Sequence, residues 1–222
     1  MSAVRTILIK DLRVELRTLQ SLPAMALFAV TTFVIFRFGL DRTSLEGSLA
    51  AGVLLVTVLF AALLAINRLF VAEREEGGFD AIRLAPVDPS ALFVGKVLAL
   101  TTYLVVLEAV ALPVFAGFFL DDASGLPPLA GIVLLLDIGL AATGTVVSTM
   151  GANSRARDLL TPLILLPLLV PLMIAAAGAA EPLLAAGGPE FADVGQWALT
   201  MALYDGLFCL VGYAVYDFLL ED

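Results

Sequence analysis

The chain has 222 residues, of which 61% are hydrophobic and 15% are charged, and its mean hydropathy is +1.03. Soluble domains are about 45–50% apolar and about 25% charged, so this composition excludes an ordinary soluble domain. The net charge of −9 argues against a nucleic-acid partner. The chain has no histidine and one cysteine, Cys209, which excludes a disulfide framework, a Cys/His zinc site and histidine acid–base chemistry.

Residues 1–21 differ in kind from the rest of the chain. Leucines recur there at helical spacing, at Leu8, Leu12, Leu16 and Leu19, while three basic residues lie elsewhere on the turn. The pattern predicts a basic amphipathic helix that lies in the membrane interface. A segment that only anchors the chain through its positive charge fits equally well.

Six stretches are long and apolar enough to span a bilayer, which takes about 20 residues. The predicted spans are residues 22–40, 48–70, 93–119, 128–150, 159–178 and 196–219. These are continuous apolar runs without alternating polarity, which excludes a β-barrel. The connections are short, so we predict an all-α membrane protein with a single transmembrane permease domain over residues 1–222.

The fifth predicted span and the segment after it are unusual. Pro162, Pro167 and Pro171 predict a bent or locally opened helix, because proline removes a backbone hydrogen bond. Residues 179–195 are expected to form a loop or a re-entrant segment on the outer face.

Basic residues in the connections predict the orientation. Ten of them fall on one side, and only Arg37 and Arg42 fall on the other. This bias places both termini and the connections at 71–92 and 151–158 in the cytoplasm.

The connection at 71–92 has the highest charge density. Gly77 and Gly78 predict a break in the helix, and Asp88 followed by Pro89 predicts a helix start with an Asp N-cap. Between them, Phe79 and Ile82 fit a short transverse helix with an apolar face. We favour a cytoplasmic coupling helix that docks on a partner over a connector that only reverses the chain.

The overall plan resembles the permeases of type 2 ABC exporters, with Leu84-Ala85-Pro86-Val87 followed by Leu92, Gly95 and Lys96 as the motif that leads into the third span. More closely, the chain resembles the CcmB family of cytochrome c maturation, through the stretch from Phe70 to Phe79 and the segment Lys10–Arg17. The family pattern F-x-x-D-x-x-D-G-S-L appears here with Glu73 and Glu76 for the two aspartates, Gly78 for the serine and Phe79 for the leucine.

The resemblance implies a subunit of the bacterial inner membrane that couples ATP hydrolysis in a separate CcmA-like ATPase to heme delivery, or to release of a loaded CcmE-like periplasmic chaperone. A CcmC-like membrane protein is a further implied partner. Heme is then a possible cargo, no cofactor is expected to bind this chain directly, and ATP is handled only by the partner. The residues implied to contact the ATPase are Phe70, Glu73, Glu76, Gly77, Gly78, Phe79, Ile82 and Arg83. The chain has no GxxxxGK[ST] motif, so we do not expect it to be an enzyme.

Three acidic residues fall inside predicted spans, at Glu108, Asp137 and Asp205. A charge at the bilayer centre costs about 2.5–3.5 kcal/mol on insertion scales, which makes such residues functional candidates. We expect Glu108 and Asp137 to be protonated or hydrogen-bonded to hydroxyl groups on facing helices. They line a substrate path or a subunit interface, or they only join helices.

Two other functions remain open at this point. One is an ABC permease for another substrate, such as a lipid, a polysaccharide or a drug. The other is a membrane scaffold that transports nothing.

Overall fold

The computed structural model describes residues 3–42, 44–69, 88–151 and 157–221, and within these ranges it is all-helical. Its seven helices are α1 (Ala3–Thr18), α2 (Ser21–Gly39), α3 (Gly47–Arg68), α6 (Pro89–Phe119), α7 (Leu126–Gly151), α8 (Arg157–Leu183) and α9 (Val194–Glu221). All except α1 are long and apolar enough to cross a membrane. The predicted fold class is therefore confirmed.

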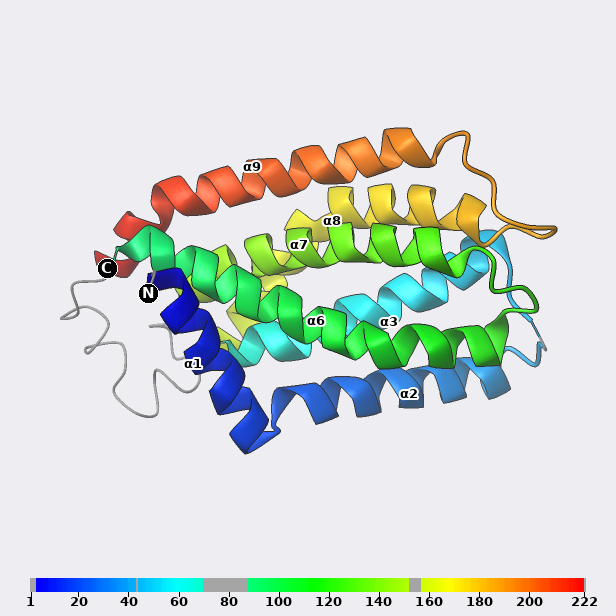
Figure 1. The fold of residues 1–222 in the computed structure, drawn as a ribbon, viewed down its shortest axis with the longest axis horizontal. Coiled ribbons are helices and arrows are strands. Elements are labelled where there is room, and N and C mark those ends of the chain that lie inside the picture. The colour runs from blue at the N-terminus through cyan, green and yellow to red at the C-terminus, as the bar shows by residue number, and fades with distance from the viewer. Residues whose placement is uncertain (1–2, 43, 70–87, 152–156, 222) are drawn as a thin grey trace.

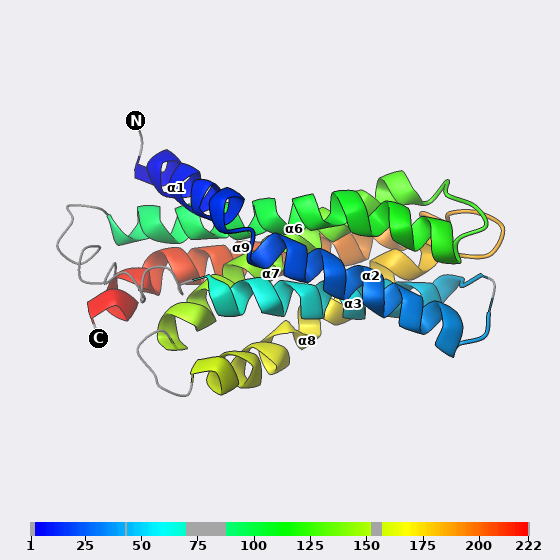
Figure 2. The same ribbon diagram turned by 90° about the horizontal axis from the view of Figure 1, so that it is seen from below.

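The six long helices run side by side along one axis, and α1 lies at a steep angle to them (Figure 1). Both chain termini lie at the same end of this bundle, which we call the terminal end, and the other end is the distal end. Helix α7 is central, because it packs against α3, α6, α8 and α9 (Figures 1 and 2).

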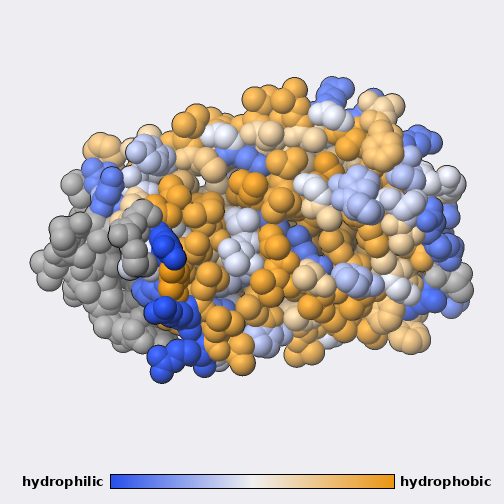
Figure 3. Space-filling model, in the orientation of Figure 1, coloured by the Kyte–Doolittle hydropathy of each residue, from blue (hydrophilic) through white to orange (hydrophobic). Residues whose placement is uncertain are grey.

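The outside of the bundle is apolar, as lipid contact requires. Figure 3 shows hydrophobic residues over the middle of one face and hydrophilic residues gathered at its two ends. Helix α9 presents a stripe of exposed residues at helical spacing, at Leu199, Leu203, Leu207, Leu210 and Phe218. Because lipid tails are as apolar as leucine, this exposure carries no penalty in a bilayer.

Polar and small residues instead gather inside, along α7. Thr143, Ser148 and Thr149 are buried there. Gly144 lets the helix approach α3 closely, since a Cβ atom at this position would come within 2.6 Å of Ile66 Cδ1. Small residues that allow close approach are typical of helix packing in membranes, where the hydrophobic effect does not drive helices together.

The boundaries of the spans agree with the predicted ones to within a few residues, except on α8. This helix continues through Pro182 to Leu183, beyond the predicted end at residue 178. Residues 184–193 form turns without a helix of their own, and Gly187 and Gly188 adopt positive φ angles of 90° and 116° within them.

Backbone hydrogen bonds join the connections at the distal end. The N–H of Leu45 donates to the carbonyl of Phe119 at 2.8 Å, and the N–H of Gly47 donates to the carbonyl of Leu184 at 2.7 Å. The connection between α2 and α3 is thereby tied to the ends of both α6 and α8. In this structure the distal ends of these helices are held together.

We predict that Gly144→Val destabilises the protein by about 1–3 kcal/mol, because the added side chain overlaps Ile66 in a packed interface. The matched control is Gly131→Val on the same helix, where a Cβ atom meets nothing within 4 Å. Thermal unfolding in detergent, followed by size-exclusion chromatography, measures the difference. Equal melting temperatures for the two variants would contradict the close contact between α3 and α7.

Candidate functional site: a buried ion pair and a layer of acids

The corner between α1 and α2 is held by the side chain of Glu15. Its Oε1 accepts hydrogen bonds from the N–H groups of Ser21 and Leu22, both at 2.8 Å. These N–H groups begin α2 and have no partner within the helix, and a carboxylate is also favoured at a helix N-terminus by the helix dipole. At this corner Leu19 adopts a left-handed φ of 47°. The direction of α1 relative to α2 is therefore set by a specific bond.

A second contact fastens α1 to the bundle. Lys96 of α6 is only 1% exposed, and its Nζ lies 3.0 Å from Oδ2 of Asp11. The same Nζ donates to the carbonyl of Leu69, at the end of α3, at 3.1 Å. The hydroxyl of Tyr103 donates to the carbonyl of Asp11 at 3.0 Å. We call Asp11, Lys96, Tyr103 and the Leu69 carbonyl the Lys96 junction, and it joins α1, α3 and α6.

Small and polar neighbours make the Lys96 junction possible. A Cβ atom on Gly95 would approach Cγ2 of Ile7 to 2.7 Å, so glycine allows α1 to lie directly on α6. On the other side of α3, the hydroxyl of Ser148 donates to the carbonyl of Ile66 at 2.9 Å. Lys96 and Ser148 thus both bond to carbonyls at the end of α3.

Helix α6 begins at the terminal end with the predicted cap. The carboxylate of Asp88 accepts from the N–H of Ser90 at 3.0 Å and from its hydroxyl at 2.6 Å, and Pro89 is the first helical residue. These bonds lower the pKa of Asp88 below its ordinary value. The two ends of the connection between α3 and α6 are therefore fixed, by Lys96 at Leu69 and by the cap at Asp88.

The residues implied to contact an ATPase lie in that connection and outside the described residues. They are Phe70, Glu73, Glu76, Gly77, Gly78, Phe79, Ile82 and Arg83. Their docking role stays a prediction, and so does the transverse helix.

The three intramembrane acids lie at one level of the bundle. Each is eleven residues from the distal end of its helix, Glu108 on α6, Asp137 on α7 and Asp205 on α9. At 1.5 Å per residue this is about 16 Å deep, near the centre of a hydrocarbon core of about 30 Å. All three are buried, with exposed fractions of 6%, 0% and 5%.

Glu108 and Asp137 lie close to each other, on two helices that pack together, α6 and α7. No donor among the described residues bonds to Oε1 of Glu108 or to either oxygen of Asp137. The expected hydroxyl partners are therefore not found there.

Asp205 is separate from this pair and lies against Gly139 of α7 and Leu172 of α8. The hydroxyl groups nearby bond elsewhere, because Tyr204 donates to the carbonyl of Leu168 at 3.0 Å and shares a bond of 3.1 Å with Thr143. Neither oxygen of Asp205 accepts a hydrogen bond within the described part of the chain.

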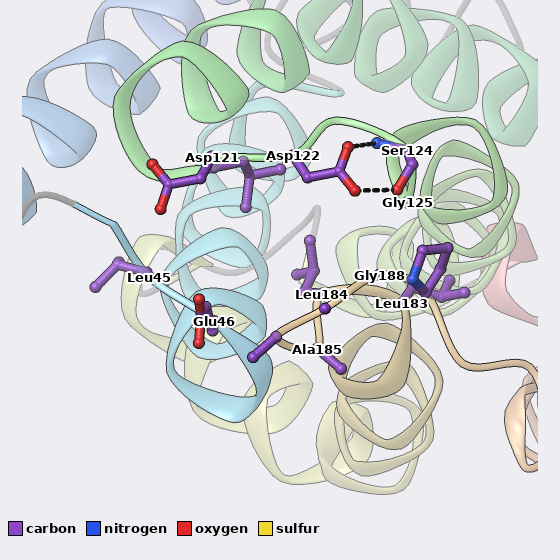
Figure 4. Close-up of a pocket in the computed structure, with 14 residues that line it drawn as sticks. Leu45, Glu46, Asp121, Asp122, Ser124, Gly125, Leu183, Leu184, Ala185 and Gly188 are labelled. Atoms are coloured by element: carbon purple, nitrogen blue, oxygen red, sulfur yellow. Dashed lines mark hydrogen bonds between the residues drawn. The ribbon is translucent and has the colours of Figure 1, made fainter.

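A cavity of about 250 Å³ lies among the distal connections, lined by residues that include Leu45, Glu46, Asp122 and Leu184 (Figure 4). The N–H and the hydroxyl of Ser124 donate to the carboxylate of Asp122 at 2.9 and 2.6 Å, and they lower its pKa. Sites that enclose drug-sized ligands measure about 300–1,000 Å³, so this cavity is too small to enclose a porphyrin.

The fold and its buried polar groups define a polytopic α-helical membrane protein. Comparison with known proteins narrows this class. The family model described as CcmB protein matches residues 2–219. The chain is 30% identical to heme exporter protein B of Paracoccus denitrificans, over 90% of this chain and 92% of the relative. It is 29% identical to heme exporter protein B of Rhodobacter capsulatus, over 77% and 79% of the two chains. The chain therefore belongs to the CcmB family.

Sequence reasoning missed the Lys96 junction, although the signal was present. Asp11 and Glu15 are spaced four residues apart and lie on the packed side of α1 with Leu8 and Leu12. Leu16 and Leu19, predicted to belong to the apolar face, are 68% and 57% exposed. Acids among the packed residues of an amphipathic helix indicate a buried cationic partner. The interfacial position of α1 itself stays a prediction.

We predict that Lys96→Met destabilises the protein by about 3–5 kcal/mol, because it removes the buried cation from Asp11 and leaves only the half-exposed Lys10 beside that carboxylate. Adding Asp11→Leu to this variant removes both charges and should recover most of the lost stability. Thermal unfolding in detergent measures both effects.

The matched control is Lys10→Met. Lys10 also pairs with Asp11, at 3.1 Å, but its side chain is 47% exposed, so a loss under about 1 kcal/mol is expected. If Lys96→Met were no more harmful than Lys10→Met, the Lys96 junction would not stabilise the fold.

Proposed function

We propose that this chain is the membrane subunit of an ABC-type heme-handling complex in cytochrome c maturation. In this proposal it couples ATP hydrolysis by a CcmA-like partner ATPase to heme delivery, or to release of a loaded CcmE-like periplasmic chaperone. The complex sits in the bacterial inner membrane, and a CcmC-like protein is a further partner. The printed names of the relatives and the family membership support this function.

The observation that carries the coupling role is the Lys96 junction. The segment that would contact the ATPase lies in the sequence between Leu69 and Asp88. Leu69 is bonded to Lys96 of α6, and Lys96 is paired with Asp11 of α1. A force applied between Leu69 and Asp88 therefore acts on α1, α3 and α6 as one unit, because the bonds between them are buried and short.

The basic residues support the proposed orientation. With the terminal end in the cytoplasm, Arg68 and Lys96 lie at the cytoplasmic ends of their helices, as the positive-inside rule expects. The distal end then faces the periplasm, where a chaperone would act.

The backbone bonds that tie the distal connections together support a subunit that transmits movement. In this proposal heme remains cargo of the complex, and movement of the tied distal helices acts on the partner that carries it.

We predict that the double variant Glu73→Lys, Glu76→Lys loses the partner ATPase. Two carboxylates that pair with basic residues on the ATPase would become repulsive, and two exposed ion pairs correspond to a roughly tenfold weaker association. The measurement is the amount of CcmA-like ATPase that co-purifies with the tagged chain from solubilised membranes, together with heme-stained c-type cytochromes in the same cells.

The control is Glu181→Lys with Glu190→Lys, which reverses two exposed charges at the distal end. It should leave the ATPase bound. Intact co-purification of the Glu73, Glu76 variant would contradict the docking role. If an ATPase that cannot hydrolyse ATP still supports normal cytochrome formation, the scaffold function is favoured instead. Normal cytochrome formation without this chain would favour a permease for another substrate.

A further inference from the structure

A groove runs between α6 and α7 beside the Glu108–Asp137 pair. It has a volume of about 590 Å³ and is lined by residues from Val105 to Pro113 on α6 and from Leu126 to Leu134 on α7. It follows α6 for about 12 Å, or roughly two helical turns. Val105 and Leu134 are 41% and 44% exposed, so this α6–α7 groove opens to the outside of the bundle.

The α6–α7 groove offers hydrogen-bond acceptors and no side-chain donors. Glu108 lines it, and Asp137, which lies near Glu108, is fully buried. Pro113 has no N–H to donate to the carbonyl of Ala109 one turn earlier, and both residues line the groove. The other lining side chains are apolar. In a bilayer these acceptors have no water to bond to.

No cation of the described residues reaches this level. The nearest basic residue along α6 is Lys96, which is twelve residues, or about 18 Å, away and already belongs to the Lys96 junction. The amines of lipid headgroups are also distant, because Glu108 lies eleven residues, or about 16 Å, from the distal end of α6.

We propose that the α6–α7 groove receives a transmembrane helix of another polypeptide, which presents an arginine or lysine to Glu108. An apolar ridge of that helix fills the two-turn groove, and its basic side chain pairs with the carboxyl of Glu108, the acid that lines the groove. The pairing also lowers the free-energy cost of placing the partner's basic residue inside the membrane, because charged residues at this depth usually pair with an opposite charge.

A second copy of this chain is a poorer occupant. In a dimer with a two-fold axis along the membrane normal, a residue meets its counterpart at the same depth. Two copies joined at this groove would bring Glu108 and Asp137 of one copy against the same acids of the other. The charges therefore favour a different polypeptide.

The test places a photo-crosslinking amino acid at Val105 in the full chain, in the membranes of its own cells. We expect a crosslink to a polypeptide other than this chain. Mass spectrometry should locate it in a transmembrane segment that contains an arginine or lysine. The control position is Leu203 on α9, which is 67% exposed and lies away from the groove.

Two kinds of second-site variant test the contact. Glu108→Leu with Asp137→Leu should lower the crosslink roughly three- to tenfold, which corresponds to the loss of one or two bonds between helices in a bilayer. Ala130→Phe places a large side chain in the groove and keeps both acids, and it should lower the crosslink by a similar factor. This variant keeps the test valid if the double variant fails to fold. Ala202→Phe, at an exposed position of α9, should have no effect.

A charge exchange completes the test. Glu108→Lys should abolish the crosslink, and replacing the basic residue of the captured segment with glutamate should restore it. The proposal is overturned if Val105 crosslinks only to a second copy of this chain, or no more strongly than Leu203. It is also overturned if the captured segment contains no basic residue, or if Ala130→Phe leaves the crosslink unchanged. Crosslinking at Val105 reports contact at the groove and not ATPase binding. A negative result would therefore reject this proposal without rejecting the proposed coupling to an ATPase.

Discussion

The buried pair of Lys96 and Asp11 is the constraint on which the terminal end of the bundle depends. A charged ammonium group that is 1% exposed is tolerated only if nearly all its hydrogen-bonding capacity is met by protein. Lys96 forms an ion pair with a carboxylate of α1 and donates a hydrogen bond to the carbonyl of Leu69 at the end of α3, so these helices converge on α6. Gly95 supplies the space for that convergence, and Glu15 supplies the corner that directs α1 toward it.

The chain thus contains two buried polar centres that differ in charge. One combines a cation with an anion, and the other contains only acids. At the terminal end, a cation and an anion satisfy each other within the described chain. Near the middle of the bundle, Glu108, Asp137 and Asp205 form a layer of acids, and no cation of the described residues bonds to the buried oxygens there. The first centre is paired within this subunit. The helix proposed to enter the α6–α7 groove would bring a cation to the second.

Helix α6 connects these two centres. It begins at the Asp88 cap beside the proposed ATPase contact, carries Lys96 about two turns further on, and carries Glu108 deeper in the bundle. In the proposed function, a displacement at the terminal end would be passed along this helix to the α6–α7 groove. At the distal end, backbone bonds tie α6 and α8 to the start of α3, so the helices respond together.

The sequence by itself determined the class of protein, the number of spans and most of their boundaries, because the thickness of a bilayer sets the length of an apolar run. It also determined the start of α6, since the Asp88–Pro89 cap is local. Only the tertiary structure decided which buried polar groups meet. Asp11 pairs with Lys96 and Glu108 lies near Asp137 across different helices, and these partners depend on packing that no local pattern encodes. The end of α8 was likewise decided by turns and bonds beyond Pro182, since proline alone did not end the helix.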